Sequence, residues 1–362
     1  MYSKFVNWVE ENDYLYKNFC DIEKCLNQYL SMTIGDNQRL KEHICNNFNT
    51  VLGKCDQISY DEDGVPEAYI ILHFLDRYHR FQLMLLDMFR SATFPIKKKI
   101  RIMDIGTGPG PSLYAISDMV ALYQQYEMEV YGESQIEAVE MDYVEQSQGF
   151  RAFLHRMTEI LMDYRERIYV PFHFGNYYDA SKLDFSGKIS REASICVDGA
   201  YTYREHYEEK VAKSFDLVVY SNFLTNMDVM VRFEQQLKSA AFYLRNRGKI
   251  LVVGGNPKDK KYEPVYQRID ELILGQDYQS RKFLGACRKL GEISEMCYSD
   301  NDCYGKQIKK FYAEVLDSLT DKNWEEKLET TFRMWMCNYL DSDKQTKWHY
   351  EIFERRSKYR RE

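Results

Sequence analysis

The first 95 residues carry apolar side chains at the spacing of α-helices. The clearest segment is 67–89, where apolar residues recur at steps of three and four positions and therefore share one helix face. Those residues are Ile70, Phe74, Tyr78, Phe81 and Leu85. Pro66 suits the first turn of this helix, and Asp36 or Asn37 is expected to cap the helix before it. The pattern predicts a helical N-terminal region over residues 1–95.

From residue 98 onward, short apolar runs of strand length alternate with longer helical segments. The runs fall at 100–105, 136–140, 169–174, 217–219 and 249–255. Residues 217–219 are continuously apolar, as expected of a strand buried on both faces of a parallel sheet. Alternation of this kind is typical of an α/β fold.

Four expectations concern the remaining segments. Residues 181–213 are polar and are expected to form a connecting segment with a helix near 205–213. A helical insertion is expected at about 257–330, with helices over 262–274 and 306–319. The chain then closes on an antiparallel hairpin that pairs 332–340 with 348–353. The second domain thus spans 96–362.

A glycine-rich turn connects the first of these runs to a helix. Asp104 lies within the strand, and Gly106, Gly108 and Gly110 follow at alternate positions, with Pro111 opening the helix. Strand, glycine turn and helix together direct backbone N–H groups toward a polar or anionic ligand. The spacing is G-x-G-x-G and differs from the G-x-G-x-x-G of dinucleotide-binding proteins.

The stretch from Asp104 to Gly110 resembles motif I of the class I S-adenosylmethionine-dependent methyltransferases. The resemblance implies a Rossmann-like, seven-stranded, mostly parallel sheet. It also implies that S-adenosylmethionine is the cofactor and S-adenosylhomocysteine the product. In that family the loop holds the methionine and sugar portions of the cofactor, here through Asp104, Gly106, Thr107, Gly108, Pro109 and Gly110.

The second family motif is an acid that accepts hydrogen bonds from both ribose hydroxyls. Glu140, followed by Met141, is the expected match, because 143–162 then supplies the next helix. Glu133 is the rival. A carboxylate suits a vicinal diol since its two oxygens are acceptors at a fixed separation.

Later motifs complete the resemblance. Asn176 is expected to bond the adenine amino group with Tyr177 beside the ring, and Asp179 is the alternative. Residues 215–224 resemble motif IV and bring Ser221 to the cofactor. Residues 244–255 resemble the glycine turn and fifth strand of the family.

The acceptor of the methyl group is less defined. Motif IV continues as Ser-Asn-Phe-Leu, which lacks the Pro-Pro turn of many nucleic-acid and protein N-methyltransferases. The chain has no Pro-Cys dipeptide, the usual nucleophile for cytosine C5 methylation. Candidate catalytic residues are Tyr220, Asn222, His73 and Tyr203. Arg77 shares a helix stripe with His73, and this stripe is either a solvated face or a part of the substrate site.

Two functions follow. The first is an enzyme that methylates a small molecule or a peptide, which suits a net charge of −7 and 30 tyrosines. The second is an RNA- or ribosome-associated methyltransferase-like protein, or a non-catalytic cofactor-binding scaffold of that kind. This alternative rests on the basic stretches 97–101 and 355–361. It is linked to a weaker resemblance to the Rsm-twenty-two-like methyltransferases, carried by residues 108–110 and 139–140, although the cysteine ligands of that family do not align here.

Cysteine usage and the termini bear on location. The nine cysteines are scattered without a C-x-x-C pair, so free thiols are expected and no metal site is predicted. The first residues lack the apolar core of a signal peptide, and no apolar run approaches the roughly 18 residues that a membrane span requires. A cytoplasmic protein is expected.

Overall fold

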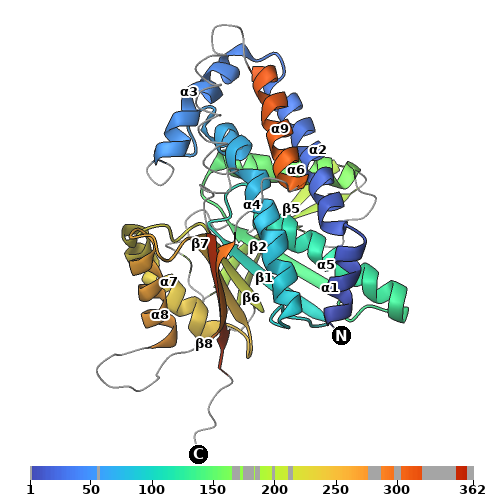
Figure 1. The fold of residues 1–362 in the computed structure, drawn as a ribbon, viewed down its shortest axis with the longest axis vertical. Helices are drawn as coiled ribbons and strands as arrows, with labels where there is room; N and C mark the ends of the chain where they lie inside the picture. The colour runs from blue at the N-terminus through green and yellow to red at the C-terminus, as the bar shows by residue number, and fades with distance from the viewer. Residues whose placement is uncertain are drawn as a thin grey trace, which may run out of the picture.

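The computed structural model describes residues 2–54, 58–164, 172–173, 183, 188–197, 200–210, 215–275, 287–296, 303–319 and 348–356. Figure 1 shows a helical layer above and beside a central sheet. The helices are α1 (Tyr2–Glu11), α2 (Tyr14–Ile34), α3 (Gln38–Lys54), α4 (Val65–Arg90), α5 (Pro111–Tyr131), α6 (Gln148–Tyr164), α7 (Met227–Tyr243), α8 (Glu263–Leu274) and α9 (Cys303–Leu319). The strands are β1 (Lys99–Ile105), β2 (Ala138–Val144), β3 (Phe172–His173), β4 (Lys188–Val197), β5 (Ala200–Lys210), β6 (Leu217–Ser221), β7 (Lys249–Gly255), β8 (Cys287–Met296) and β9 (Trp348–Arg355).

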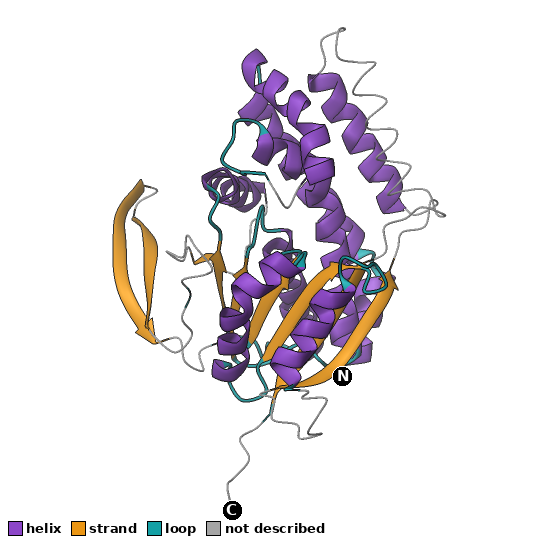
Figure 2. Ribbon diagram, turned by 90° about the vertical axis from the view of Figure 1, so that its left-hand side faces the viewer, coloured by secondary structure: helices purple, strands orange, loops and turns teal. Residues whose placement is uncertain are grey.

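Seven of the described strands form one sheet in the order β3-β2-β1-β6-β7-β9-β8 (Figure 2). Strands β3, β2, β1, β6 and β7 are parallel, and β9 runs antiparallel to both β7 and β8. The seven-stranded, mostly parallel sheet expected from the sequence is confirmed. From β1 the chain adds β2 and β3 on one side of the sheet, and β6 and β7 then follow on the other side of β1. The strand order thus reverses between β1 and β6, and ligands of open α/β sheets bind at such a switch point.

The register brings three strand ends to that point. Ile105 at the end of β1 pairs with Val144 on one side and Tyr220 on the other. The loops that follow β1, β2 and β6 therefore leave the sheet next to one another. Strand β1 is buried from Ile100 to Ile105, as a central parallel strand should be.

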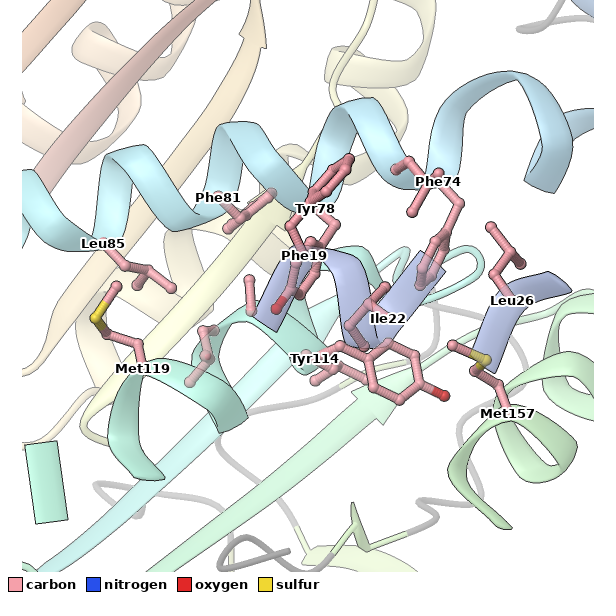
Figure 3. Packing of buried hydrophobic residues seen from close by; sticks show 14 of the residues in the cluster. Phe19, Ile22, Leu26, Phe74, Tyr78, Phe81, Leu85, Tyr114, Met119 and Met157 are labelled. Atoms are coloured by element: carbon pink, nitrogen blue, oxygen red, sulfur yellow. The ribbon is translucent and has the colours of Figure 1, made fainter. Parts of the chain in front are cut away.

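The N-terminal helices share a hydrophobic core with α5, α6 and one face of the sheet (Figure 3). Figure 3 shows Phe74, Tyr78 and Leu85 of α4 directed toward Tyr114 and Met119 of α5. The Phe74 and Tyr114 rings lie 5.8 Å apart in an edge-to-face arrangement. Helix α9 joins the same layer, because the Tyr312 hydroxyl donates to the Leu72 carbonyl at 2.9 Å. The opposite face is covered by α7 and α8.

Helix α4 follows the predicted spacing closely. All five residues of the predicted apolar stripe are buried, and Pro66 lies in the first turn. Upstream, the Asn37 side chain accepts from the Leu40 N–H at 3.1 Å, which identifies Asn37 as the cap of α3.

Strand β2 differs from the prediction that it ends at Glu140. It continues to Val144, and α6 begins at Gln148 instead of Tyr143. The reason is the pairing with β1, which matches all seven positions from Lys99 to Ile105. Every second side chain of β2, at Val139, Met141 and Tyr143, lies in the core that the strand shares with the N-terminal helices. This two-residue alternation, typical of a strand, continues beyond Glu140.

The helix predicted near 205–213 is wrong. Residues 200–210 form β5, which pairs antiparallel with β4 in a separate two-stranded sheet. Tyr201 and Tyr203 already alternate at the period of a strand, and pairing along the full length of β4 outweighs the local helical tendency of the Glu- and Lys-containing end.

The predicted partner of the last strand is also wrong. Strand β9 confirms the run at 348–353, but its two edges are occupied by β7 and β8. The stretch 257–330, expected as a helical insertion, therefore contributes β8 to the sheet as well as α8 and α9. Residues 332–340 lie outside the described residues. No helix in the described part of the chain is both long and apolar enough to cross a membrane.

Candidate functional site

A cavity of about 380 Å³ opens at the carboxyl ends of β1, β2 and β6. Its volume lies within the range usual for small-molecule sites. Gly106, Gly108, Glu145 and Asn222 form the part of its wall that the sheet supplies. The segment before α4 and α4 itself supply Tyr60, Asp61, Tyr69 and Arg77, and the start of α7 supplies Thr225 and Arg232.

The glycine turn after β1 has the positive φ angles that its sequence predicts. Gly106, Gly108 and Gly110 have φ angles of 68°, 59° and 78°, a region that glycine enters without steric cost. The N–H groups of Gly106 and Thr107 both donate to the Val144 carbonyl, at 3.0 and 3.2 Å. The turn is thereby held against the end of β2.

The three glycines face different surroundings. A Cβ at Gly106 would lie 2.1 Å from the Phe223 ring, and one at Gly110 would lie 2.4 Å from a methyl group of Leu154. A Cβ at Gly108 would meet no atom within 4 Å and would project into open space. Gly106 and Gly110 therefore lie against side chains at positive φ, which favours glycine, whereas Gly108 exposes its backbone to the cavity.

Asp104 lies beneath this turn and does not line the cavity. Its side chain is completely buried, and the Ser112 hydroxyl donates to its Oδ2. The Thr107 hydroxyl donates to its backbone carbonyl at 3.1 Å. Oδ1 has no hydrogen-bond partner. Burial, with a smaller contribution from Glu145, raises the pKa of Asp104 to about 7.

This buried carboxyl predicts a measurable pH dependence of stability. Because its pKa is higher in the folded than in the unfolded chain, the free energy of unfolding should fall as pH rises from about 4 to about 7 and then level off. At about 1.4 kcal/mol per pKa unit, the contribution is at most about 4 kcal/mol. Asp104→Asn keeps an acceptor for Ser112 and should remove this slope.

Denaturant unfolding of both proteins at pH values across this interval measures the effect. The difference between the two slopes isolates Asp104, since all other titrating groups are shared. Equal slopes in the wild-type protein and Asp104→Asn would show that Asp104 has the same pKa in the folded and the unfolded chain.

Glu145 follows the last residue of β2 and lines the cavity. Its Oε2 accepts from the Gly108 N–H at 2.6 Å, and its Oε1 accepts from the Ser147 N–H at 2.7 Å. Burial raises its pKa, while these backbone hydrogen bonds and nearby Arg151 lower it. The carboxylate is thus held rigidly beside the open position at Gly108.

Glu140, the expected ribose acid, does not reach the cavity. It lies in the middle of β2 opposite Arg101, and the Arg101 Nε is 2.9 Å from its Oε2. Met141 points into the core shared with the N-terminal helices. The rival Glu133 is exposed in the turn after α5. Because β2 is longer than predicted, Glu145 lies at the end of the strand. The alternation of buried side chains through Tyr143 is the sequence signal that indicates this longer strand.

The end of β6 brings a second polar group to the cavity. Asn222 has a φ of 50°, which is uncommon for a residue other than glycine, and its N–H donates to the Val253 carbonyl at 2.8 Å. Its side-chain amide donates to the Ser221 hydroxyl at 3.3 Å. Ser221 is buried. Of the three predicted residues at 220–222, Asn222 is the one that lines the cavity.

Tyr220 is placed elsewhere. Its side chain is buried in the core between the sheet and helices α7 and α8, so it is not positioned to contact a substrate. Tyr203 lies in β5 and pairs with Ile195 in the two-stranded sheet. Asn176 and Tyr177, the adenine candidates, and the alternative Asp179 lie outside the described residues.

Helix α4 contributes Tyr69 and Arg77 to the cavity, but not His73. His73 is buried, and its ring packs against that of Tyr69 at 4.9 Å. Burial, followed by the charges of Arg77 and Arg80, holds the pKa of His73 well below its usual value. His73 therefore packs against Tyr69 as a neutral ring. The helix stripe that contains His73 and Arg77 is not a solvated face, and only Arg77 of this pair lines the cavity.

Comparisons with known proteins identify distant structural relatives. No protein-family model matches the chain, and no curated protein matches it either. Among solved structures, phosphoethanolamine N-methyltransferase 2 of Haemonchus contortus, in complex with phosphomonomethylethanolamine and S-adenosylhomocysteine, is 13% identical, with a TM-score of 0.42, over 86% of this chain and 61% of that chain. An S-adenosylmethionine-dependent methyltransferase of Geobacter sulfurreducens in complex with S-adenosylhomocysteine is 12% identical over 76% and 91%, with a TM-score of 0.40.

The [4+2]-cyclase SpnF is a further similar structure, 11% identical over 77% of this chain and 81% of that chain, with a TM-score of 0.42. The present chain thus spans less than two thirds of the Haemonchus protein. Similarity this distant carries no information about substrate or activity.

Proposed function

We propose that this protein is an S-adenosylmethionine-dependent methyltransferase that acts on a small molecule or a peptide. The observation that carries the proposal is that Glu145 and Gly108 line one cavity and are joined by a hydrogen bond, while the space beside the Gly108 Cα is empty. A carboxylate at the end of the second strand suits the two hydroxyls of a ribose. A glycine whose Cβ position is empty allows a ligand to approach the backbone.

Each group of the wall has a part in this proposal. Glu145 binds the ribose through the acceptor capacity that its two backbone hydrogen bonds leave. Gly106 and Gly108 provide the surface for the amino-acid end of the cofactor. Asp104 supports the turn from below without touching the ligand. When bound, the cofactor supplies the electrophilic methyl group, so the protein mainly orients the reactants and excludes water.

The acceptor is proposed to bind on the α4 side of the same cavity. Tyr60, Tyr69 and Arg77 line that side, and Asn222 lines the same cavity. A neutral, buried His73 is not positioned to take a proton from the acceptor. Asn222 is the remaining predicted residue that is available to contact the acceptor.

An RNA-binding function has less support. Three of the basic residues in 97–101 are paired with carboxylates: Lys97 with Asp216 at 2.6 Å, Lys98 with Glu137 at 2.6 Å, and Arg101 with Glu140 at 2.9 Å. Phosphate binding would have to compete with these pairs. The basic end at 357–361 lies outside the described residues.

Calorimetry tests the proposed cofactor. S-adenosylhomocysteine should bind the full-length protein in a 1:1 ratio with a dissociation constant in the micromolar range, on the order of −8 kcal/mol. NAD should not bind measurably, because the turn lacks the dinucleotide spacing. Binding of NAD in preference to S-adenosylhomocysteine would overturn the proposal.

A further inference from the structure

The cavity wall joins two parts of the chain that are distant in sequence. Gly108 and Glu145 belong to loops of the sheet, whereas residues 58–61 precede α4 in the N-terminal region. All four residues of this segment line the cavity, and we call them the wall segment. The shape of the cavity therefore depends on how the wall segment is held against the loops of the sheet.

The wall segment is attached to the loop between β2 and α6. The Ser147 hydroxyl donates to the Tyr60 carbonyl at 2.8 Å, and the Gln148 N–H donates to Asp61 Oδ1 at 2.7 Å. The Asp61 carboxylate thus meets the N-terminus of α6, where negative charge is favourable. The Tyr60 ring also packs against the Phe150 ring, with a centroid distance of 4.9 Å. These contacts fix the wall segment to the start of α6.

The same Ser147 also holds the proposed ribose acid. Its backbone N–H donates to Glu145 Oε1 at 2.7 Å, and Glu145 Oε2 accepts from the Gly108 N–H at 2.6 Å. A continuous chain of hydrogen bonds thus runs from Gly108 through Glu145 and Ser147 to Tyr60. Ser147 is buried, and hydrogen bonds away from water are stronger and reinforce one another.

Serine suits this position for more than helix capping. Its oxygen accepts from the Phe150 N–H at 3.3 Å, which caps α6. An aspartate would also cap the helix, but an ionised carboxylate has no hydrogen to donate to the Tyr60 carbonyl. The serine hydroxyl accepts and donates at the same time. Capping alone therefore does not account for the hydrogen bond to the wall segment.

Close packing beside Ser147 links the movements of the two segments. A Cβ at Gly149 would lie 2.4 Å from a carbon of the Pro66 ring and 3.3 Å from the Tyr60 carbonyl oxygen. The loop after β2 and the chain that leads into α4 thus touch along their backbones. Because packed segments transmit displacements, a shift of this loop displaces the wall segment as well.

We propose that Ser147 is a positioning residue that couples the cofactor to the wall segment. When the ribose hydroxyls donate to Glu145, this carboxylate is fixed, and Ser147 then holds residues 58–61 in place as the wall on the acceptor side. The inference rests on the proposed methyltransferase function and adds an order to it, in which the cofactor binds before the acceptor. Since coupling between two sites is reciprocal, a bound acceptor also tightens the binding of the cofactor.

Hydrogen–deuterium exchange of the full-length protein tests this coupling. Exchange is measured by mass spectrometry with and without S-adenosylhomocysteine, at a concentration that saturates each variant according to calorimetry. In the wild-type protein the ligand should slow exchange of peptides that cover residues 58–61 by about fivefold, the effect expected from securing one hydrogen bond.

Three substitutions of Ser147 show whether the slowing passes through its hydroxyl. In Ser147→Ala the ligand should no longer slow exchange of the wall segment, because the donor to Tyr60 is lost while the backbone N–H at position 147 still reaches Glu145. Ser147→Thr keeps the hydroxyl and should restore the slowing. Ser147→Gly removes the same donor and disturbs the helix cap least, so it tests the coupling even if Ser147→Ala folds poorly.

Asn37→Ala is the matched control. Asn37 caps α3 outside the cavity, so this variant loses a helix cap without losing a contact to the wall segment. The ligand should slow exchange of residues 58–61 in Asn37→Ala as much as in the wild-type protein. Loss of the slowing in this variant too would mean that any lost cap has the same effect, and would overturn the role of Ser147.

The outcomes separate the two proposals. If S-adenosylhomocysteine binds but leaves exchange of the wall segment unchanged in the wild-type protein, or slows it equally in Ser147→Ala and Ser147→Gly, the coupling through Ser147 is overturned and the methyltransferase proposal stands. If S-adenosylhomocysteine does not bind the wild-type protein, the methyltransferase proposal fails and the coupling fails with it.

Discussion

Replacing Glu145 by alanine should lower the affinity for S-adenosylhomocysteine at least 100-fold. The variant loses the carboxylate that is proposed to accept from both ribose hydroxyls, and hydrogen bonds to a charged group contribute about 1.5–3 kcal/mol each. It also leaves the Gly108 N–H without its acceptor at 2.6 Å. Calorimetry of the wild-type protein and the variant under identical conditions measures the change.

Glu140→Ala is the control for this experiment. Glu140 lies on the same strand and was the acid expected from the sequence, but it pairs with Arg101 away from the cavity. It should bind S-adenosylhomocysteine within about twofold of the wild-type protein. Loss of binding in Glu140→Ala with retention in Glu145→Ala would reverse the assignment of the ribose acid.

Substitution of two loop glycines, Gly106 and Gly108, by alanine should separate folding from ligand binding. Gly106→Ala should destabilise the protein by about 3 kcal/mol or more, because its Cβ overlaps the Phe223 ring and its φ is positive. Gly108→Ala should cost only about 1–2 kcal/mol for its φ of 59°. Yet Gly108→Ala should weaken S-adenosylhomocysteine binding at least tenfold, since its methyl group enters the cavity.

Gly132→Ala is the matched control for Gly108→Ala. Gly132 ends α5 with a φ of 78° and, like Gly108, has no atom within 4 Å of an added Cβ. It does not line the cavity. Denaturant unfolding should give similar losses for the two variants, whereas calorimetry should show reduced affinity only for Gly108→Ala. Equal affinities would mean that no ligand approaches the loop at Gly108.

Much of the site was predictable because its determinants are local. The three glycines need positive φ, and their positions in the chain are visible without knowledge of the fold. Asn222 was also identified, since it immediately follows an apolar strand. The apolar stripe of α4 follows from helix periodicity alone, and every member is buried.

Glu145 was missed because strand length is a property of a pair of strands. The apolar run near Glu140 ends early when read alone, and the seven-residue match with β1 extends it to Val144. The five-residue difference places Glu145, and not Glu140, in the cavity wall. His73 and Arg77 show a similar limit. They lie four positions apart on one helix face, but the ring of His73 is buried whereas Arg77 lines the cavity.

Local chemistry alone therefore established the glycine turn, the buried central strands and the main N-terminal helix, because backbone strain and apolar periodicity are written in neighbouring residues. Contacts distant in sequence settled the remainder. Pairing with β1 placed Glu145 at the end of β2, occupation of both edges of β9 excluded the predicted hairpin, and the packing of α4 on α5 put Arg77 in the cavity wall. These outcomes depend on register and burial, which no single segment encodes.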